Sequence, residues 1–355
     1  MFSPPTELTC ALGFPSRAFH PTLVPLRTAC YSSSMKCYEI SDWPLLAETL
    51  RRPYQNTYYA MYSSVFGGIV TDPRLMLVPI DDHMVHRGDG VFEALKAVNG
   101  NIYNLTAHLD RLVNSARGIA LDLPVSLPEL KHILIETAQV AGLRTCMLRI
   151  YVSRGPGGFG VNPYECPAAQ LYVVITTLGT PFMSMHPDGA RVCTSAIPSK
   201  SADMAKIKNC NYAPNVLMKK EAVDRKFDFP MGFDERGFLT EGATENMGIV
   251  SHDNRLLFPN LARILTGTTM LRIMELSHEL VHEGSLAFSG LADITLKDIL
   301  AARELIIVGT TLNVVAGVEF DGHPIGTGKT GPVYQHLAAL LEKDMTTNPA
   351  ILTPL

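Results

Sequence analysis

The sequence predicts a mixed α/β protein built from two unequal lobes. Both halves alternate β-rich runs with stretches of helical periodicity, which is the pattern of folds that combine helices with sheets. The chain has 355 residues, enough for two domains with sizeable cores. The segment 179–189 is rich in Gly and Pro and has the composition of a linker. We therefore expect an N-terminal α/β domain over 55–178 and a larger C-terminal domain over 190–350.

The first half has a clear order of elements. Asn99-Gly100 separates two apolar-rich runs and predicts a hairpin, because both residue types tolerate positive φ. Leucines and other apolar residues at helical spacing predict a helix over 105–116. A second helix should begin after Ser126, a good N-cap, and end at Gly142. The β-rich runs that follow are 147–153 and 170–178.

The second half mixes shorter elements. Helices are expected from Pro214 to Lys226, over 296–303 and from Pro332 towards Lys343. Asp321-Gly322 predicts another hairpin. The expected strands are 229–234, 238–242, 246–251 and 304–309.

Composition argues against several classes of function. The formal net charge is −4 and no basic block occurs, so we expect neither nucleic acid nor an anionic membrane as a partner. No apolar run approaches the roughly 20 residues of a membrane helix. The seven cysteines contain no Cys-x-x-Cys pair, which favours free thiols in a reducing compartment.

The first 34 residues differ from the rest of the chain. They are rich in Ser, Thr and Pro, carry Arg17 and Arg27, and have no acidic residue after Glu7. This composition is typical of an organelle transit peptide, and a true start at Met35 is the alternative. We expect a cytoplasmic protein, or a mitochondrial or plastid one if the segment is a transit peptide.

Three motifs suggest sites that their context does not support. "GPGGFG" (155–160) fits a dinucleotide fingerprint, but the prolines in the "VNPYECP" that follows forbid the required helix. "GTGKTG" (326–331) has His323 where a phosphate-binding loop needs Gly, so a turn is expected. "DDHMVHRGDG" (81–90) lacks a metal-site signature and is expected to be a loop with hydrogen-bonded histidines. No metal is predicted.

The stretch "MAKIKNCNYAPNVLMKKEA" (204–222) raises the question of a catalytic lysine, since it holds Lys206, Lys208, Lys219 and Lys220. A free lysine has a pKa near 10.4 and is protonated, so it becomes nucleophilic only where burial or positive charge lowers that pKa. Pyridoxal phosphate (PLP) is a cofactor that demands such a lysine. It also needs an arginine and helix-end amides for its phosphate, and an acid facing its pyridine nitrogen.

Six motifs together carry a resemblance to a known family. They are "HRGDGVFEALKAVNGNIYNLTAHLDRL", "KNCNYAPNV", "LTEGATEN", "LTGTT", "VGTT" and "DGHPIGTGKTGPV". In this order and spacing the chain resembles, from about Tyr59 to Leu341, the class IV PLP enzymes of fold type IV. These are the D-amino acid transaminases, the branched-chain aminotransferases and the aminodeoxychorismate lyases. The resemblance implies a two-domain fold of this type, with a smaller N-terminal lobe and a larger C-terminal lobe.

The resemblance also implies roles for individual residues. Lys208 would form the Schiff base with PLP, and Lys206, Lys219 and Lys220 would have no chemical role. Tyr212 would contact the phenolic oxygen of the cofactor, and Glu241 would face its pyridine nitrogen. The phosphate-binding positions would be Arg111, Thr268, Thr269 and Thr310. Thr268 replaces an isoleucine common in the family, which should be tolerated because backbone amides bind the phosphate.

The residues expected to bind the substrate match the family motifs less closely than the cofactor-binding residues do. "RGPGGFGVNP" lacks the Arg-x-His by which many bacterial D-amino acid transaminases hold the substrate carboxylate, and it resembles the branched-chain loop instead. In that register Arg149 would lie near the substrate carboxylate, or it would be a strand arginine in a surface pair. Phe92 and Thr311 are further candidates for substrate binding.

The resemblance implies a homodimeric, PLP-dependent aminotransferase of amino acid metabolism that converts an amino acid to a 2-keto acid. The donor could be a D-amino acid or a branched-chain one. One alternative is an aminodeoxychorismate lyase that releases pyruvate and 4-aminobenzoate. The sequence "FEA" at 92–94 is of the transaminase kind, although lyases often carry a threonine in this neighbourhood. The other alternative is a non-catalytic PLP-binding protein, which would have no need of Lys208, Glu241 and Arg111 together.

Overall fold

The structure, a computed structural model, describes residues 35–355. The predicted transit peptide, residues 1–34, lies outside the described residues. The chain divides into a unit that ends at Glu48 and a compact unit from Thr49 to Leu355. The first unit contains a 3-10 turn, η1 (Ile40–Asp42), and most of α1 (Trp43–Thr49).

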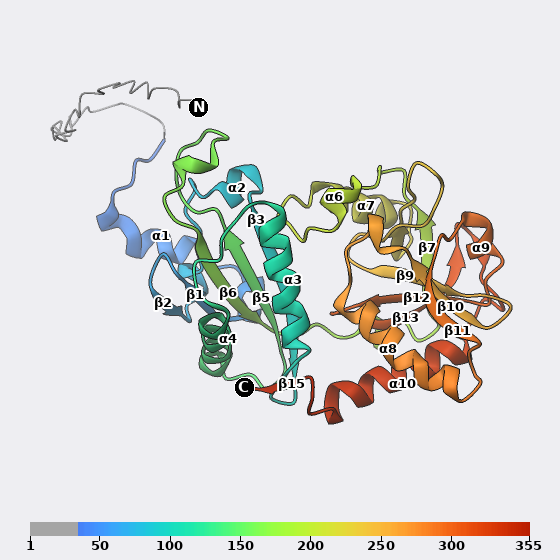
Figure 1. The fold of residues 1–355 in the computed structure, drawn as a ribbon. Coiled ribbons are helices and arrows are strands. Elements are labelled where there is room, and N and C mark those ends of the chain that lie inside the picture. The colour runs from blue at the N-terminus through green and yellow to red at the C-terminus, as the bar shows by residue number, and fades with distance from the viewer. Residues whose placement is uncertain (1–34) are drawn as a thin grey trace, which may run out of the picture. The chain divides into compact units, whose positions relative to one another are not determined.

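Seven strands of the larger unit form one sheet, in the order β15-β4-β3-β5-β6-β1-β2, with every neighbouring pair antiparallel. Its strands are β1 (Tyr58–Ser63), β2 (Gly68–Val70), β3 (Gly90–Val98), β4 (Asn101–Tyr103), β5 (Cys146–Ser153), β6 (Gln170–Thr176) and β15 (Leu352–Pro354). Two helices, α3 (Leu105–Gly118) and α4 (Leu127–Ala141), pack against this sheet (Figure 1). Their apolar faces and the strands share one hydrophobic core.

Local sequence explains these elements, and the predicted hairpin, helices and strands of this half are confirmed. Asn99 and Gly100 have φ of 52° and 85°, as the two-residue turn between β3 and β4 requires. The Ser126 side chain accepts a hydrogen bond from the amide of Glu129 at the start of α4. Gly142 ends that helix with a φ of 70°, a conformation that costs glycine little.

The second sheet is mixed, in the order β11-β10-β9-β12-β13-β7-β8, and β14 pairs with β13. The pairs β7–β8, β7–β13 and β10–β11 are parallel, and the others are antiparallel. The predicted hairpin at Asp321-Gly322 is confirmed, since these two residues turn the chain from β13 into β14 with φ of 46° and 84°. The strands of this sheet are β7 (Ala190–Thr194), β8 (Phe229–Met231), β9 (Asn246–Val250), β10 (Arg255–Pro259), β11 (Phe288–Ala292), β12 (Glu304–Gly309), β13 (Asn313–Phe320) and β14 (His323–Pro324).

Helices cover this sheet and connect its strands. Two long helices, α8 (Thr268–His282) and α10 (Pro332–Thr347), pack on the sheet and against each other (Figure 1). Side chains of β12 and β13 take part in two hydrophobic clusters. One cluster also contains side chains of α8 and α10, and the other contains side chains of β7 and β8. The remaining helices are α2 (His83–Arg87), α5 (Phe182–Met185), α6 (Ala202–Ala205), α7 (Ala213–Asp224) and α9 (Leu296–Leu300), with 3-10 turns η2 (Pro53–Thr57), η3 (Pro73–Leu75), η4 (Pro163–Glu165) and η5 (Leu261–Arg263).

Some predictions differ from the structure. The predicted strand 238–242 is wrong, because its residues make only isolated bridges, each to a different segment. The predicted loop with hydrogen-bonded histidines is partly wrong, because His83 begins the short helix α2, which Asp82 caps. The predicted linker 179–189 carries α5. The domain bounds 55–178 and 190–350 remain a prediction, and the last strand, β15, pairs with β4 of the first sheet.

Two of the three discounted motifs have the local structure that was expected. No helix opens at 155–160, and 326–331 forms a turn before α10. Within 35–355, no group of three or more His, Cys, Asp and Glu side chains is arranged to hold a metal. None of the helices in this range is long and apolar enough to cross a membrane.

Candidate active site

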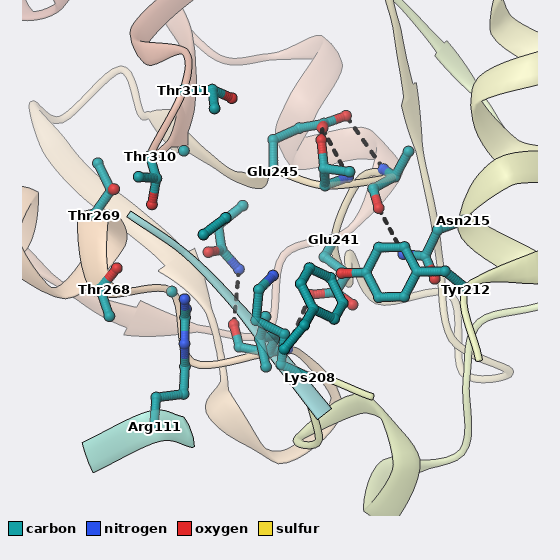
Figure 2. A pocket seen from close by; sticks show the side chains of 18 of the residues that line it. Arg111, Lys208, Tyr212, Asn215, Glu241, Glu245, Thr268, Thr269, Thr310 and Thr311 are labelled. Atoms are coloured by element: carbon teal, nitrogen blue, oxygen red, sulfur yellow. Dashed lines mark hydrogen bonds between the residues drawn. The ribbon is translucent and has the colours of Figure 1, made fainter. Parts of the chain in front are cut away.

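A cavity of about 330 Å³ lies between the two sheets (Figure 2). Its size is within the roughly 300–1,000 Å³ of ordinary small-molecule sites. Residues from widely separated parts of the chain line it. They include all ten positions singled out from the sequence: Phe92, Arg111, Arg149, Lys208, Tyr212, Glu241, Thr268, Thr269, Thr310 and Thr311. The fold therefore brings the predicted site residues together, although their individual roles remain predictions.

Lys208 is held in the cavity by its backbone. The amide of Phe92 donates to the Lys208 carbonyl at 2.9 Å, and the Lys208 amide donates to Ser115 Oγ at 3.1 Å. Its Nζ lies 4.6 Å from the centre of the Phe92 ring and 5.8 Å from that of Tyr212. The other three lysines of the stretch, Lys206, Lys219 and Lys220, are exposed.

The surroundings of Lys208 favour an uncharged amine. Burial, followed by the nearby charges of Arg111 and Lys200, lowers the pKa of Lys208 to about 8. Glu93 and Glu241 oppose this shift. A measurable fraction of the amine is therefore unprotonated near neutral pH, as nucleophilic chemistry requires.

Arg111 is fixed by a buried carboxylate on β3. Its Nε and one terminal nitrogen donate to the two carboxylate oxygens of Glu93 at 2.7 and 2.9 Å, and its other terminal nitrogen donates to the Thr266 carbonyl at 3.1 Å. Burial alone would raise the pKa of Glu93, but the charge and hydrogen bonds of Arg111 lower it to about 2. The guanidinium is thus held in one orientation, beside the start of α8.

The N-terminus of α8 opens into the same end of the cavity (Figure 2). Its N-cap is Gly267, no side chain caps it, and its first turn has no acidic residue. The first amides of a helix lack internal partners and attract anions. A Cβ atom on Gly267 would lie 1.8 Å from Asn246 Oδ1, so any larger residue would force the Asn246 side chain to move. The Thr268 hydroxyl lies 3.2 Å from His108 Nε2, which ties this end to the Glu93 network.

Glu241 lies at the opposite end of the cavity from the threonines (Figure 2). Its Oε2 accepts a hydrogen bond from the Leu265 amide at 2.9 Å. Burial raises the pKa of Glu241, while the Leu265 amide and the charges of Lys200 and Lys208 oppose that rise. Such a carboxylate is prepared to accept a hydrogen bond from a protonated ring nitrogen, because that partner would favour its charged form.

Aromatic side chains and Arg149 form further walls. The Phe92 and Tyr212 rings meet edge to face, with centroids 5.0 Å apart. Arg149 lies on β5 opposite Ala94 and donates to Thr176 Oγ1 at 3.0 Å. It lines the cavity and is in no ion pair among the described residues. The surface-pair alternative for Arg149 is therefore not what the structure shows.

The sequence did not single out several cavity or supporting residues. Glu93 and His108 hold Arg111 and the start of α8, and Lys200 lies with its Nζ 4.7 Å from the centre of the Tyr212 ring. Asn215 donates to the Ala243 carbonyl at 2.6 Å, while its buried Oδ1 has no hydrogen-bond partner among residues 35–355. The spacing of Glu93 and Arg111 gave no signal, since one lies on strand β3 and the other on helix α3. Asn215 could have been suspected only because it follows Lys208 within one motif.

These groups fit PLP. An uncapped helix N-terminus with a fixed arginine suits a phosphate, and a lysine of lowered pKa suits an aldehyde. A half-buried carboxylate at the far end suits a pyridine nitrogen. The unpaired Asn215 Oδ1 also indicates that the cavity is built for a polar occupant, because buried polar atoms normally have partners.

Comparison with known proteins decides the family. A sequence model of the family described as amino-transferase class IV matches residues 90–320, which is most of the chain. The chain belongs to the class IV aminotransferases. Members of this family use PLP, and the chain is a PLP-dependent transferase that converts an amino acid to a keto acid. No comparison favours the lyase alternative.

Several aminotransferases are similar in sequence. The chain is 38% identical over 293 residues to "D-amino-acid transaminase, chloroplastic" of Arabidopsis thaliana, covering 82% of this chain and 78% of that one. It is 28% identical over 268 residues to "Branched-chain-amino-acid aminotransferase" of Pseudomonas aeruginosa, covering 72% and 83%.

Solved structures agree in fold. A branched-chain amino acid aminotransferase from T.th., crystallised with pyridoxamine 5'-phosphate, has a TM-score of 0.77 and 26% identity, covering 84% of this chain and 98% of that one. This class IV aminotransferase adopts the fold type that the sequence resemblance implied.

Proposed function

We propose that this class IV aminotransferase acts on D-amino acids, with Lys208 as the catalytic residue. The relative with 38% identity is named as a D-amino-acid transaminase, which favours D-amino acids as donors. Branched-chain L-amino acids are the second candidate. They are favoured by the "GFGVNP" loop and by the similarity to branched-chain enzymes.

The observation that carries the catalytic role of Lys208 is the arrangement of groups around it. The lysine of lowered pKa lies in the cavity with a fixed arginine and a helix N-terminus at one end and the half-buried carboxylate of Glu241 at the other (Figure 2). Of the four lysines in its stretch, Lys208 is the one that lines this cavity.

Each residue would have a distinct task. Arg111, the amides of Thr268 and Thr269, and Thr310 would hold the cofactor phosphate, and Glu241 would hold the proton on the ring nitrogen. Tyr212 would contact the phenolic oxygen. PLP, when bound, supplies an electron-withdrawing ring that stabilises negative charge at the substrate α-carbon.

Lys208 would then move the proton of the reaction. Its Nζ, through the unprotonated fraction that the lowered pKa provides, would remove the α-proton of the amino acid and later return a proton as general acid. Arg149, which lies on β5 opposite Ala94, would pair with a substrate carboxylate. Phe92 and Thr311 would border the substrate side chain.

A donor panel tests the substrate class. Purified protein would be supplied with matched D- and L-forms of alanine, aspartate, leucine and valine, with pyruvate and 2-oxoglutarate as acceptors, and product keto acids would be measured. Preferential use of D-forms supports the proposal, and preferential use of L-leucine and L-valine would replace it by the second candidate. Aminodeoxychorismate, tested alone, reports lyase activity, and Lys208→Ala is the inactive control.

We also propose a homodimer, as the family resemblance implies. Four exposed apolar side chains lie on α2 or shortly before it and offer apolar surface for a second copy of the chain. They are Leu75, Leu77, Ile80 and Val85. Sedimentation equilibrium should give twice the chain mass. A fully active monomer would contradict the proposal.

We propose a plastid location. The composition of residues 1–34 supports it, and so does the relative named as chloroplastic. A fluorescent protein fused after residue 60 should enter plastids, and one fused to a chain that starts at Met35 should stay in the cytosol. Equal distribution of both fusions would contradict the proposal.

A further inference from the structure

A second cavity, of about 570 Å³, lies between the two sheets beside the segment 179–184. Its walls come from the end of β3, the turn between β12 and β13, and α10. One residue, Thr311, lines both this cavity and the active-site cavity. The second cavity shares no other lining residue with the active-site cavity.

A buried lysine without a carboxylate partner lines this second cavity. Lys96 is 4% exposed, and its Nζ donates to Asn313 Oδ1, a neutral acceptor. It also lies 5.9 Å from the centre of the Tyr103 ring. Burial lowers the pKa of Lys96 to about 8, so the amine is still largely protonated at neutral pH.

No nearby acid neutralises this charge in the described residues. Asp344 is already engaged, since it accepts hydrogen bonds from Arg272 and from the Tyr103 hydroxyl. Glu342 lines the cavity, but it is exposed and makes no ion pair with Lys96. Buried lysines are seldom found unpaired, because the desolvated charge is costly. The arrangement therefore calls for an anionic partner from outside the chain.

The other walls indicate which kind of anion fits. Thr145, Thr180 and Ser184 also line the cavity, and residues of this kind carry hydroxyl groups that can donate hydrogen bonds. Apolar side chains, among them Leu178 and Met183, line it too. A cation, a few hydroxyls and apolar surface suit a carboxylate with a hydrocarbon part better than a bare inorganic ion.

We propose that this cavity is a second binding site, which takes a small organic carboxylic acid whose carboxylate pairs with Lys96. Its hydrocarbon part contacts Leu178 and Met183. The site does not depend on whether the donor is a D- or an L-amino acid. Because Thr311 borders both cavities, an acid bound here lies directly behind the active-site wall.

Calorimetric titration of the PLP-loaded enzyme with 4-methylvaleric acid tests the site. This acid has no amino or keto group and cannot be transaminated. Two binding events per chain are expected, one at each cavity. Visible absorbance of the bound cofactor, followed in parallel, identifies the event at the active site. Lys96→Met should weaken the other event by about thirtyfold or more, as expected for loss of one partner of a buried charge pair. Lys131→Met, which removes an exposed lysine on α4, should change neither event.

A second variant tests the site while Lys96 is kept. Asn313→Asp gives Lys96 an internal carboxylate, and Asp tolerates the φ of 63° found at Asn313. It should abolish the second event while the active-site event keeps its affinity, which also shows that the variant is folded. A wild type whose only binding event changes the cofactor absorbance would overturn the proposal, and so would a second event that both variants leave unchanged. Inorganic sulfate that displaces the acid at equal concentration would overturn the organic-acid assignment.

Discussion

Two lysines with lowered pKa values, Lys208 and Lys96, show that a similar shift can serve different chemistry. Burial is the first cause of the lowered pKa of each, which falls to about 8 in both. Lys208 lies among charged groups, and Lys96 touches a neutral amide and an aromatic ring. Burial alone yields an amine that can lose its proton, but a catalytic site also needs neighbours that hold a cofactor.

The neighbours of Lys208 are organised by a second layer of contacts. Glu93 holds Arg111 through both carboxylate oxygens, and its Oε2 also lies 2.7 Å from His108 Nδ1. Lys96 has no carboxylate partner among the described residues, because the nearby Asp344 pairs with Arg272 and the Tyr103 hydroxyl instead. This difference means that changes around Lys208 should affect catalysis, whereas changes at Lys96 should affect stability and binding.

The largest expected effect is at Lys208. Lys208→Ala should lower turnover on the order of 10⁴-fold or more, because the residue serves as nucleophile, base and acid. It should also remove the visible absorbance of the lysine-linked cofactor. Lys206→Ala, which changes an exposed lysine two residues away, is the matched control and should leave both unchanged. If Lys206→Ala alone removed the absorbance, the assignment of the catalytic lysine would be off by two residues.

Glu241→Gln should have the next largest effect on activity. The variant keeps the side-chain size and loses the charge that favours a protonated ring nitrogen. Proton abstraction should slow by about 10²-fold, on the order of 3 kcal/mol of transition-state stabilisation. Stopped-flow measurement of the half-reaction reads this step. The cofactor should be retained, because Arg111 and the start of α8 lie at the other end of the cavity. Near-normal proton abstraction would show that Glu241 is not the partner of the ring nitrogen.

Glu93→Gln should destabilise the fold and loosen the cofactor phosphate. Removing one partner of a buried pair leaves the Arg111 charge uncompensated, which costs about 3 kcal/mol in the free energy of unfolding. Urea unfolding of the cofactor-free protein measures this. Glu136→Gln, at an exposed position on α4, should change stability by less than about 0.5 kcal/mol. Equal stability of the Glu93→Gln protein and the wild type would mean that the Glu93–Arg111 pair does not stabilise the fold.

The same pair gives a pH dependence with a definite sign. The pKa of Glu93 falls from 4.5 to about 2 on folding, so its carboxylate stabilises the fold fully above pH 4.5. This contribution is lost as pH falls from 4.5 towards 2. The stability difference between wild type and Glu93→Gln should therefore shrink over that window, as followed by urea unfolding at several pH values. A difference that grew on acidification would contradict the assignment.

The smallest expected effect is at Lys96. Lys96→Met should raise the free energy of unfolding at pH 7 by about 2 kcal/mol, because the wild type keeps a buried, unpaired charge. The pKa of Lys96 falls from 10.5 to about 8 on folding, so this cost is full below pH 8 and disappears as pH rises towards 10.5. Thermal or urea unfolding at about pH 7 and about pH 10 measures it. A variant less stable than wild type at neutral pH would show that Lys96 has a stabilising partner.

Much of the fold was predictable from local chemistry. The hairpin at Asn99-Gly100 follows from two residues that accept positive φ, and α4 follows from its cap at Ser126 and its stop at Gly142. The strand expected at 238–242 was not formed, because strand pairing depends on which distant segment lies alongside. That region is instead divided among three partners.

The sequence by itself determined the elements and the set of residues that could serve PLP, since turns, caps and motifs act over a few neighbouring residues. Tertiary structure alone decided that Glu93 orients Arg111, that Lys200 lies beside Tyr212 and that Lys96 is buried against Asn313. The physical reason is that burial and charge pairing arise between segments far apart in the chain. The sequence alone does not distinguish Lys96 from Lys206. Only the packing of the folded chain buries Lys96 and leaves Lys206 exposed.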